Sequence, residues 1–439
     1  MFLQLFYFQL AMNTEQLHQL FLQSTGGSTD TRKISDGNIF FALKGENFNA
    51  NEFAGDALKQ GAFYAVIDEA KYAVNEKMIV VDNVLKALQQ LAKYHRKQFQ
   101  IPVLAITGSN GKTTTKELIY HVLKSQFRTI ATEGNLNNHI GVPLTLLRMN
   151  VETEIAVIEM GANHQGEIAA LCEIAEPTHG LITNIGKAHL EGFGGFEGVK
   201  KAKSELYRFI EKSKGVTFFN DEDETLKSLL GNVKEVIGYG NREENLASGK
   251  IISVDPFLKL EISAGEEKTK IQSKLLGSYN FENILCAVCV GIYFNVPMEK
   301  IKQAIEEYSP SNNRSQILEK DSNRFIMDAY NANPSSMKVA LENFQKMNAE
   351  IKIAILGDMF ELGDESEKEH QSIVDQISKM NFTKTILVGT EFGKTNSTTE
   401  MTHFKTTEDL KSWLDEQKFA NANFLIKGSR KMGLERIVK

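Results

Sequence analysis

The stretch from residue 101 to residue 117 constrains the fold of this chain more than any other. Its apolar run Val103-Leu104-Ala105-Ile106 is typical of a buried strand, and the turn Thr107-Gly108-Ser109-Asn110-Gly111-Lys112-Thr113-Thr114 follows at once. The apolar residues from Glu117 to Lys124 then recur with helical spacing. A strand, a glycine turn and a helix in this order let backbone N–H groups converge on an anion. The stretch therefore predicts a phosphate-binding loop within an α/β domain.

The residue types of this loop suit a nucleoside triphosphate. Lys112 supplies a mobile positive charge, and the Thr113 hydroxyl can bind a magnesium ion. The common phosphate loop has a glycine five residues before Gly111, whereas this chain has Ile106, so the loop is a shorter variant. The alternative is a glycine-rich strand-to-helix turn that carries a surface lysine. We predict nucleotide contacts from Gly108, Ser109, Asn110, Gly111, Lys112, Thr113 and Thr114.

Composition favours a multidomain protein that acts on small molecules. The chain has 439 residues, enough for about three domains. Its 50 basic and 56 acidic residues leave a net charge of -6, which gives no reason to expect binding to nucleic acid or to an anionic membrane. The apolar residues 1–11 are too short to span a bilayer and lack a preceding basic region, and we suspect that Met12 is the true start.

The cysteine content favours a reducing compartment. There are 3 cysteines, too few for a disulfide framework or a four-cysteine zinc site. Cys286 and Cys289 lie in an apolar, helical-looking stretch, so we expect buried core residues. A cytoplasmic location follows as the expectation.

Three blocks of alternating strand and helix patterns predict three α/β domains. Residues 1–98 have the short elements of a small α/β domain. Residues 99–310 predict a doubly wound domain around the phosphate loop, with an antiparallel edge or flap between Val233 and Ile271. Residues 311–439 predict a Rossmann-like unit, whose ligands should bind at the carboxyl ends of its strands, and Thr395 to Thr402 predicts a surface loop.

Several polar residues outside the loop could take part in chemistry. Glu159 ends an apolar strand, where nucleotide enzymes present a carboxylate to magnesium, although such a glutamate can also be simply solvated. His189 follows another strand, and by itself it predicts little. Lys203, within a predicted helix from Gly198 to Glu211, is from the sequence alone an exposed lysine. The amide-rich segment around Asn137 suggests a polar ligand or a tight loop.

From Ser28 onward the chain resembles the Mur ligases of peptidoglycan synthesis. The phosphate loop alone indicates only the superfamily, whereas three other motifs resemble the members that add a D-alanyl-D-alanine dipeptide. All the matching motifs are Thr107-Gly108-x-x-Gly111-Lys112-Thr113-Thr114, Glu133-Gly134-Asn135-x-Asn137-Asn138-x-x-Gly141-Val142-Pro143, Glu159-Met160-Gly161-Ala162, Asp328-Ala329-Tyr330-Asn331-Ala332-Asn333-Pro334-Ser335-Ser336-Met337, Leu356-Gly357-Asp358-Met359-x-Glu361-Leu362-Gly363 and Lys427-Gly428-Ser429-Arg430. The Asn-rich, Tyr-Asn-Ala-Asn-Pro and Gly-Asp-Met runs carry the narrower resemblance.

The resemblance implies an ATP- and Mg²⁺-dependent ligase that works as a monomer. It would join D-alanyl-D-alanine to a UDP-N-acetylmuramoyl-tripeptide through an acyl phosphate. By similarity, Lys112, His189 and Lys203 would be catalytic, and Thr113, Glu159, His189 and Lys203, the last as a carbamate, would hold magnesium. Asn283, Arg314 and Asp328 would contact the base, phosphates and ribose of ATP. The substrate-binding positions would be Ser28, Arg32, Lys44, Asn137, Asn138, Tyr330, Asn331 and Asn333.

Two departures and two alternatives accompany the resemblance. Tyr279 replaces a histidine that is usual in relatives, and Asn49-Ala50-Asn51 replaces a more usual Asp-Gly-His. A ligase that adds the third amino acid or a folylpolyglutamate synthase is the nearer alternative, although the chain has no Asp-Asn-Pro-Arg run of the diaminopimelate-adding enzyme. A nucleotide-dependent switch protein is the more distant one, and retention of Glu159, His189 and Lys203 together favours turnover.

Overall fold

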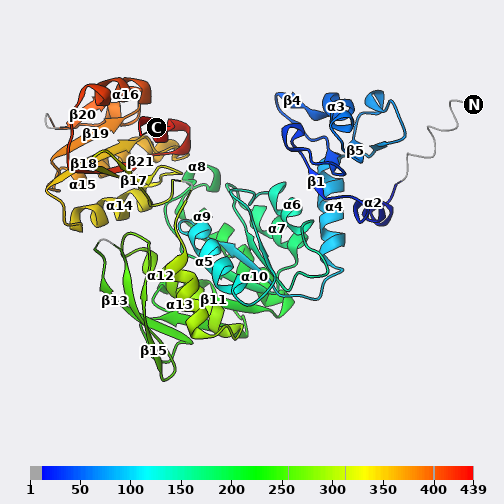
Figure 1. Ribbon diagram of the computed structural model, residues 1–439, viewed down its shortest axis with the longest axis horizontal. Coiled ribbons are helices and arrows are strands. Elements are labelled where there is room, and N and C mark those ends of the chain that lie inside the picture. The colour runs from blue at the N-terminus through cyan, green and yellow to red at the C-terminus, as the bar shows by residue number, and fades with distance from the viewer. Residues whose placement is uncertain (1–11, 256, 312, 399–400, 439) are drawn as a thin grey trace, which may run out of the picture. The chain divides into compact units, whose positions relative to one another are not determined.

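The protein is described from a computed structural model, which places residues 12–255, 257–311, 313–398 and 401–438 (Figure 1). The expectation for residues 1–11 lies outside these described residues. The chain forms two compact units. Of the described residues, those within 12–105, 127–161 and 167–179 form unit 1, and those within 106–126, 162–166 and 180–438 form unit 2.

The N-terminal part of unit 1 is a four-stranded parallel sheet in the order β1-β2-β5-β6. Its core contains Phe40, Ala65 and Met78, all nearly inaccessible to solvent. Asn83 caps α4 by accepting a hydrogen bond from the Lys86 N–H, which satisfies a helix-end donor. The elements are α2 (Thr14–Phe21), β1 (Gly27–Ser28), β2 (Ile39–Phe41), β3 (Lys44–Gly45), β4 (Phe48–Asn49), α3 (Ala54–Lys59), β5 (Tyr64–Ile67), β6 (Met78–Val80) and α4 (Val84–Arg96).

The rest of unit 1 contains the strand that ends at Glu159. This strand, β9 (Ile155–Glu159), is buried along its whole length and pairs in parallel with β8 (Thr129–Ala131). The helices here are α6 (Gly141–Leu146) and α7 (Glu167–Ala175). The predicted strand that ends at Glu159 is thus confirmed.

A nine-stranded sheet has the order β15-β14-β13-β12-β11-β10-β7-β9-β8. Strand β7 (Val103–Thr107) is entirely buried and leads through the predicted loop into α5 (Lys112–Lys124). The elements from residue 179 to residue 307 are β10 (His179–Ile182), α8 (Leu190–Phe193), α9 (Phe196–Lys203), α10 (Glu205–Ser213), β11 (Val216–Asn220), α11 (Glu224–Leu229), β12 (Glu235–Gly240), β13 (Ala247–Ser253), β14 (Lys259–Ala264), β15 (Glu267–Gln272), α12 (Asn280–Tyr293) and α13 (Met298–Glu307).

Two local predictions in this region are wrong. The expected antiparallel edge begins later, because β12 pairs in parallel with both β11 and β13, and only β13, β14 and β15 are antiparallel. The expected helix from Gly198 to Glu211 is two helices that meet at Ser204. The Ser204 hydroxyl donates to the Lys201 carbonyl and accepts from Arg208, and such local side-chain bonds compete with a continuous helix.

The C-terminal part of unit 2 is a six-stranded sheet in the order β16-β17-β21-β18-β19-β20, parallel except for β16. Figure 1 shows α14 and α15 on one side of it and α16 on the other. The predicted loop at Thr395 to Thr402 is wrong at its end, where β20 extends the sheet. The elements are β16 (Gln316–Lys320), β17 (Asn323–Asp328), α14 (Pro334–Lys346), β18 (Ile351–Gly357), α15 (Ser366–Ile377), β19 (Lys384–Val388), β20 (Met401–Phe404), α16 (Thr407–Glu416) and β21 (Ala422–Lys427).

Candidate nucleotide and ligation site

The phosphate loop depends on two glycines. Gly108 has φ 143° and Gly111 has φ 79°, both in the region that favours glycine. A Cβ atom at Gly108 would lie 2.0 Å from the Thr183 Oγ1 atom, and one at Gly111 would lie 2.7 Å from the Asn283 Oδ1 atom. Both positions therefore require glycine for conformation and for space.

A second loop, residues 183–187, holds the phosphate loop in shape. The Ser109 N–H donates to the Asn184 carbonyl at 3.0 Å, and the Asn110 N–H donates to the Asn184 side-chain oxygen at 3.0 Å. Thr183 Oγ1 donates to the Asn110 carbonyl at 2.6 Å, and the Gly186 N–H donates to Ser109 Oγ at 2.8 Å. The conformation of one loop is thus tied to that of the other.

Lys112 lies over the loop that it follows in sequence. Its Nζ atom donates to the carbonyls of Gly108 at 2.6 Å and Ser109 at 3.1 Å. Thr113 is buried and Thr114 is partly exposed in the first turn of α5. A cation, backbone N–H groups and a helix N-terminus converge here, which is the arrangement that binds a polyphosphate.

Asn283 supports this loop from α12. Its Oδ1 atom accepts from Thr115 Oγ1 at 3.0 Å, and its Nδ2 atom donates to Asn280 Oδ1 at 2.8 Å. These contacts position the start of α5. The predicted contact between Asn283 and the base of ATP stays a prediction.

Asp328 lines a pocket in unit 2 that is partly open to solvent and has about 500 Å³ of empty space, open solvent included. Tyr279 lines it, and the Tyr279 Oη and Ser315 Oγ atoms are 2.6 Å apart. Burial raises the Tyr279 pKa, as does the nearby Asp328 carboxylate, so the phenol stays neutral. The lining is mostly apolar and also contains the carboxylates of Asp328 and Asp255. Such a pocket suits a nucleoside, whose base is flat and whose sugar carries hydroxyls. The walls include Leu276, Ile326, Ala340, Phe344, Met347 and Leu425.

Asp328, which lines this pocket, has a charged partner. Its Oδ2 atom lies 2.5 Å from the Nζ atom of Lys427, a lysine whose side chain is only 3% exposed. β17 and β21 are parallel neighbours in register at these two residues, so the pair forms at the carboxyl ends of adjacent strands. Lys427 belongs to a motif of the resemblance, but the sequence assigned it no partner.

Two arginines contact the ring of Tyr330. The Arg314 guanidinium carbon lies 3.6 Å from the ring centroid, and that of Arg430 lies 4.9 Å from it. Within the described residues, neither guanidinium forms an ion pair with a carboxylate. Two cations on one ring create a positive region suited to phosphate or carboxylate oxygens. Asn331 is exposed beside it.

His189 meets Glu361 across a long stretch of chain. The His189 Nδ1 atom contacts the Glu361 carboxylate, and that hydrogen bond lowers the pKa of Glu361 below its ordinary value. His189 has φ 53° and Glu361 has φ 64°, so both residues adopt a left-handed conformation that is costly for non-glycine residues. Glu361 lies within the quoted Gly-Asp-Met motif, yet its partner could not be read from the sequence.

Lys203 is buried, contrary to the reading from sequence alone. The residue is 1% exposed, its Nζ atom lies 5.1 Å from the Phe193 ring centroid, and it lies 3.5 Å from the Ala162 carbonyl oxygen. Helix periodicity does not show which face the preceding loops cover. A lysine in such a site is the kind whose chemistry a protein can tune.

The magnesium residues fit the ion in part. Thr113 and Glu159 offer the oxygen donors that magnesium prefers, whereas the His189 nitrogen suits softer metals better and the Lys203 amine fits only as a carbamate. Glu159, in unit 1, is 1% exposed, and its Oε1 atom accepts from Asn137 Nδ2 at 2.8 Å. Among the residues placed by the structure, no group of three or more His, Cys, Asp or Glu side chains could hold a metal.

The predicted substrate residues of unit 1 form local contacts. Arg32 makes a two-point contact with Asp30, at 2.9 Å and 2.8 Å. Lys44 lies 2.9 Å from Asp68 and 2.9 Å from Glu69. The Ser28 hydroxyl donates to the Asp30 carbonyl at 3.1 Å, so Ser28 and Arg32 belong to one turn. Asn138 accepts from the N–H groups of Ile140 and Gly141, which shapes the start of α6.

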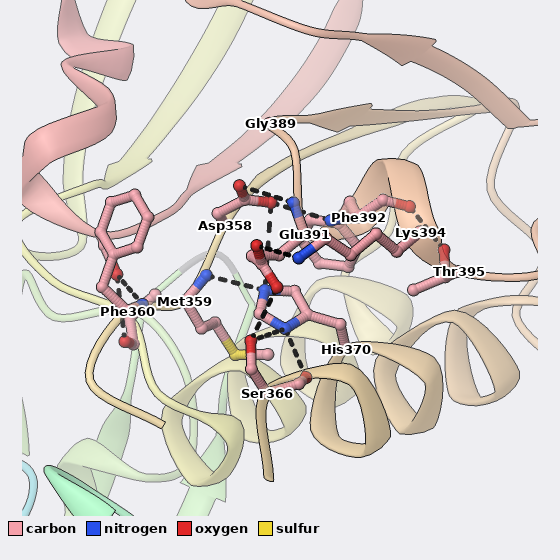
Figure 2. Close-up of polar contacts among 12 residues, drawn as sticks. Asp358, Met359, Phe360, Ser366, His370, Gly389, Glu391, Phe392, Lys394 and Thr395 are labelled. Atoms are coloured by element: carbon pink, nitrogen blue, oxygen red, sulfur yellow. Dashed lines mark hydrogen bonds and ion pairs between the residues drawn. The ribbon is translucent and has the colours of Figure 1, made fainter. Parts of the chain in front are cut away.

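Asp358 fixes the loops at the carboxyl end of the C-terminal sheet (Figure 2). It is 1% exposed and accepts from the N–H groups of Glu391 at 3.0 Å and Phe392 at 2.9 Å. His370 is fully buried next to it, and its Nε2 atom accepts from the Met359 N–H at 3.0 Å. This acceptance places the ring proton on Nδ1, facing the Ser366 carbonyl at 2.7 Å. The sequence motif marked Asp358 but not this clamp.

Comparison with known proteins matches the chain to the family that its motifs resemble. Residues 25–96 match the profile of the Mur ligase family catalytic domain, residues 106–291 that of the Mur ligase middle domain, and residues 313–429 that of the Mur ligase glutamate ligase domain. The described residues contain no helix that is long and apolar enough to cross a membrane.

Relatives of the same kind match over nearly the full length. The UDP-N-acetylmuramoyl-tripeptide–D-alanyl-D-alanine ligases of Bacillus subtilis and Escherichia coli are 34% and 33% identical, each over 94% of this chain and 92% of the relative. A crystal structure of MurF from Acinetobacter baumannii has a TM-score of 0.85 at 31% identity, over 97% of both chains. MurF from Thermotoga maritima, solved with ADP, shares the fold at 24% identity and a TM-score of 0.83, over 95% of this chain and 97% of that one.

These matches confirm the predicted α/β architecture of three domains. With its phosphate loop and its similarity to such enzymes over nearly the full length, the chain belongs to the Mur ligase family.

Proposed function

We propose that the protein joins D-alanyl-D-alanine to a UDP-N-acetylmuramoyl-tripeptide and converts ATP to ADP and phosphate. The observation that carries the proposal is the phosphate loop with Lys112 over its carbonyls, in a chain 34% identical to a relative that carries this activity as its name. The pocket beside Asp328 supplies a place for the nucleoside.

The proposed chemistry has two steps. An oxygen of the tripeptide carboxylate attacks the γ-phosphorus, the bond to the β-phosphate oxygen breaks, and ADP leaves an acyl phosphate. The amine of D-alanyl-D-alanine then attacks the acyl carbon, loses a proton, and expels inorganic phosphate as the amide forms. An anion must approach a polyanion in the first step, so positioning and charge neutralisation dominate.

Residues of unit 2 account for much of that neutralisation. Lys112 and the loop N–H groups would bind the phosphates, and the two guanidiniums on Tyr330 would add positive charge. Asp328 would accept from the ribose hydroxyls. We also propose that the substrates are bound by Ser28, Arg32, Lys44, Asn137, Asn138, Tyr330, Asn331 and Asn333.

Magnesium is proposed as the metal. Thr113, Glu159, His189 and a carbamylated Lys203 would hold it, and the ion would supply further neutralisation of the phosphate oxygens. We also propose a cytoplasmic monomer divided into domains at residues 1–98, 99–310 and 311–439. Light scattering of the purified protein would test the monomer.

An assay of ADP release tests the function. We expect ADP and phosphate only when ATP, Mg²⁺, UDP-N-acetylmuramoyl-tripeptide and D-alanyl-D-alanine are all present, together with a product whose mass equals the two joined substrates minus water. Chelation by EDTA should stop the reaction, and added Mg²⁺ should restore it. ADP release at the full rate without the dipeptide would refute the ligase.

Replacing one substrate at a time separates the alternatives. Turnover with a UDP-N-acetylmuramoyl-dipeptide and a diamino acid would instead identify a third-residue ligase, and turnover with a folate and glutamate would identify a folylpolyglutamate synthase. Nucleotide binding without any amide product would favour a switch protein.

A further inference from the structure

The loop that frames the phosphate loop is also held from the other side, by the C-terminal part of unit 2. The Lys187 N–H donates to Ser335 Oγ at 3.0 Å, and the Lys187 Nζ atom lies 2.5 Å from Glu369 Oε1. Ser335 lies in the first turn of α14, and Glu369 lies in the first turn of α15. One residue of the 183–187 loop therefore contacts two helices of the C-terminal part.

The two sides of this pair differ in burial. The Glu369 side chain is 7% exposed, whereas that of Lys187 is 49% exposed. A buried carboxylate requires a partner, because loss of its solvation is costly unless a cation or hydrogen bonds replace water. The Lys187 ammonium is the cation that contacts this carboxylate, so the ion pair connects the 183–187 loop to the C-terminal part.

The 183–187 loop lies close to both the phosphate loop and α14. A Cβ atom at Gly186 would lie 3.1 Å from Asn110 Nδ2 and 3.1 Å from Ser335 Oγ, so that glycine fits closely between the phosphate loop and α14. Asn333, which caps α14, donates from Nδ2 to Asn110 Oδ1 at 2.8 Å. The C-terminal part thus reaches the phosphate loop both directly and through the 183–187 loop.

We propose that Lys187 and Glu369 are positioning residues that tie the C-terminal part to the phosphate loop and so set its affinity for the nucleotide phosphates. Neither residue contacts the nucleotide in this scheme. Lys187 acts through Gly186 and Ser109, whose hydroxyl and backbone contacts shape the loop. The inference rests on the proposed function in that the phosphates are taken to be those of ATP.

The test compares the full-length protein with Lys187→Met, Glu369→Gln, the double variant and Lys187→Arg. ADP affinity is measured by calorimetry. This measurement needs neither the UDP-tripeptide nor the dipeptide, so its result does not depend on whether the enzyme uses D-alanyl-D-alanine. Thermal unfolding is measured alongside. The matched control is Lys368→Met, because Lys368 also belongs to α15 and pairs with Glu365 at 2.8 Å, but with side chains 75% and 49% exposed.

We expect Lys187→Met and Glu369→Gln each to weaken ADP binding about fivefold, the size typical of a partly exposed ion pair. The double variant should lose no more than the larger single loss, because both changes remove one interaction. Lys187→Arg and Lys368→Met should stay within about twofold of the wild type. Lys187→Met leaves the buried Glu369 carboxylate without its cation and should lower the unfolding midpoint, whereas Glu369→Gln removes the buried charge and should change the midpoint less, so the ADP affinity of Glu369→Gln is the reading least affected by stability.

Three results would overturn the proposal. The first is an ADP affinity of Lys187→Met equal to that of the wild type. The second is a loss of ADP affinity in the double variant equal to the sum of the two single losses. The third is a loss of ADP affinity in Lys368→Met as large as that in Lys187→Met. Failure of the proposed ligase function would look different: the wild type would bind ADP but form no amide from D-alanyl-D-alanine. A parallel fall in kcat/KM for ATP in Lys187→Met, with the KM for the dipeptide unchanged, would support the positioning role.

Discussion

At the scale of single residues, this protein depends on a few side chains whose surroundings alter their chemistry. Lys112 bends back onto the carbonyls of its own loop, and Lys203 is buried against Phe193. Glu361 is held as a carboxylate by His189, whose hydrogen bond lowers the pKa of Glu361. Each is an ordinary residue type, and its neighbours give it its role.

Replacing Lys112 by alanine should abolish turnover without unfolding the protein. The change removes a positive charge from the phosphate site, where such charges contribute a rate factor of about 10² to 10³. Steady-state ADP release measures the rate, and thermal melting checks the fold. Lys124→Ala, at the exposed end of the same helix, is the control and should keep full activity. Near-normal turnover in Lys112→Ala, or its unfolding, would contradict the role.

At the scale of elements, the carboxyl ends of the C-terminal strands are arranged by one buried acid. Asp358 follows β18 and receives backbone donors from the turn after β19. Its own carbonyl accepts from the Ser429 N–H at 3.0 Å, so the segment after β21 is included. A Cβ atom at Gly389 would lie 2.2 Å from Asp358 Oδ2, so that the clamp also demands a glycine.

The variant Asp358→Asn should destabilise this part by about 2 kcal/mol. An amide keeps one acceptor but directs an N–H₂ group at a backbone donor, which leaves a buried donor unsatisfied. The chain has 1 tryptophan, and this residue, Trp413, lies in α16, so its fluorescence follows urea unfolding of the C-terminal part. Asp375→Asn, on an exposed face of α15, should leave the midpoint unchanged. Equal midpoints for the two variants would show that Asp358 is not a clamp.

At the scale of the whole molecule, polar groups buried away from the site link stability to pH. His179 begins β10, and burial lowers its pKa from 6.5 to about 4. The folded protein therefore binds this proton less readily than the unfolded chain does. Above pH 6.5 the histidine is neutral in both states and does not lower the free energy of unfolding. As the pH falls from 6.5 toward 4, the unfolded chain takes up the proton first, so the free energy of unfolding decreases.

Lowering the pH from 7 to 5 should cost up to about 2 kcal/mol through His179 alone. His179→Asn should remove this share of the pH dependence, because the asparagine does not titrate. Urea unfolding of both proteins at the two pH values gives the difference. His139→Asn changes an exposed histidine and is the control. An identical pH dependence in wild type and His179→Asn would rule out the contribution.

Much of the fold was predictable from sequence because its signals are local. The phosphate loop needs a buried strand, glycines at positive φ and a helix start, all within residues 101–117. The strand that ends at Glu159 was predicted correctly, and so was the burial of Cys286 and Cys289. The break at Ser204 and the strand β20 were missed, since a hydroxyl back-bond and an edge strand leave weak patterns.

The sequence by itself determined that this chain would form a phosphate loop in an α/β protein, because all the residues of that motif are close together in sequence. Only the tertiary structure decided that Lys203 is buried, that His189 meets Glu361, and that Lys187 joins Glu369. In the pairs His189–Glu361 and Lys187–Glu369, the partners are separated by well over a hundred residues. The periodicity of a sequence predicts the helix or strand to which a residue belongs, but it does not predict which distant segment packs against that element.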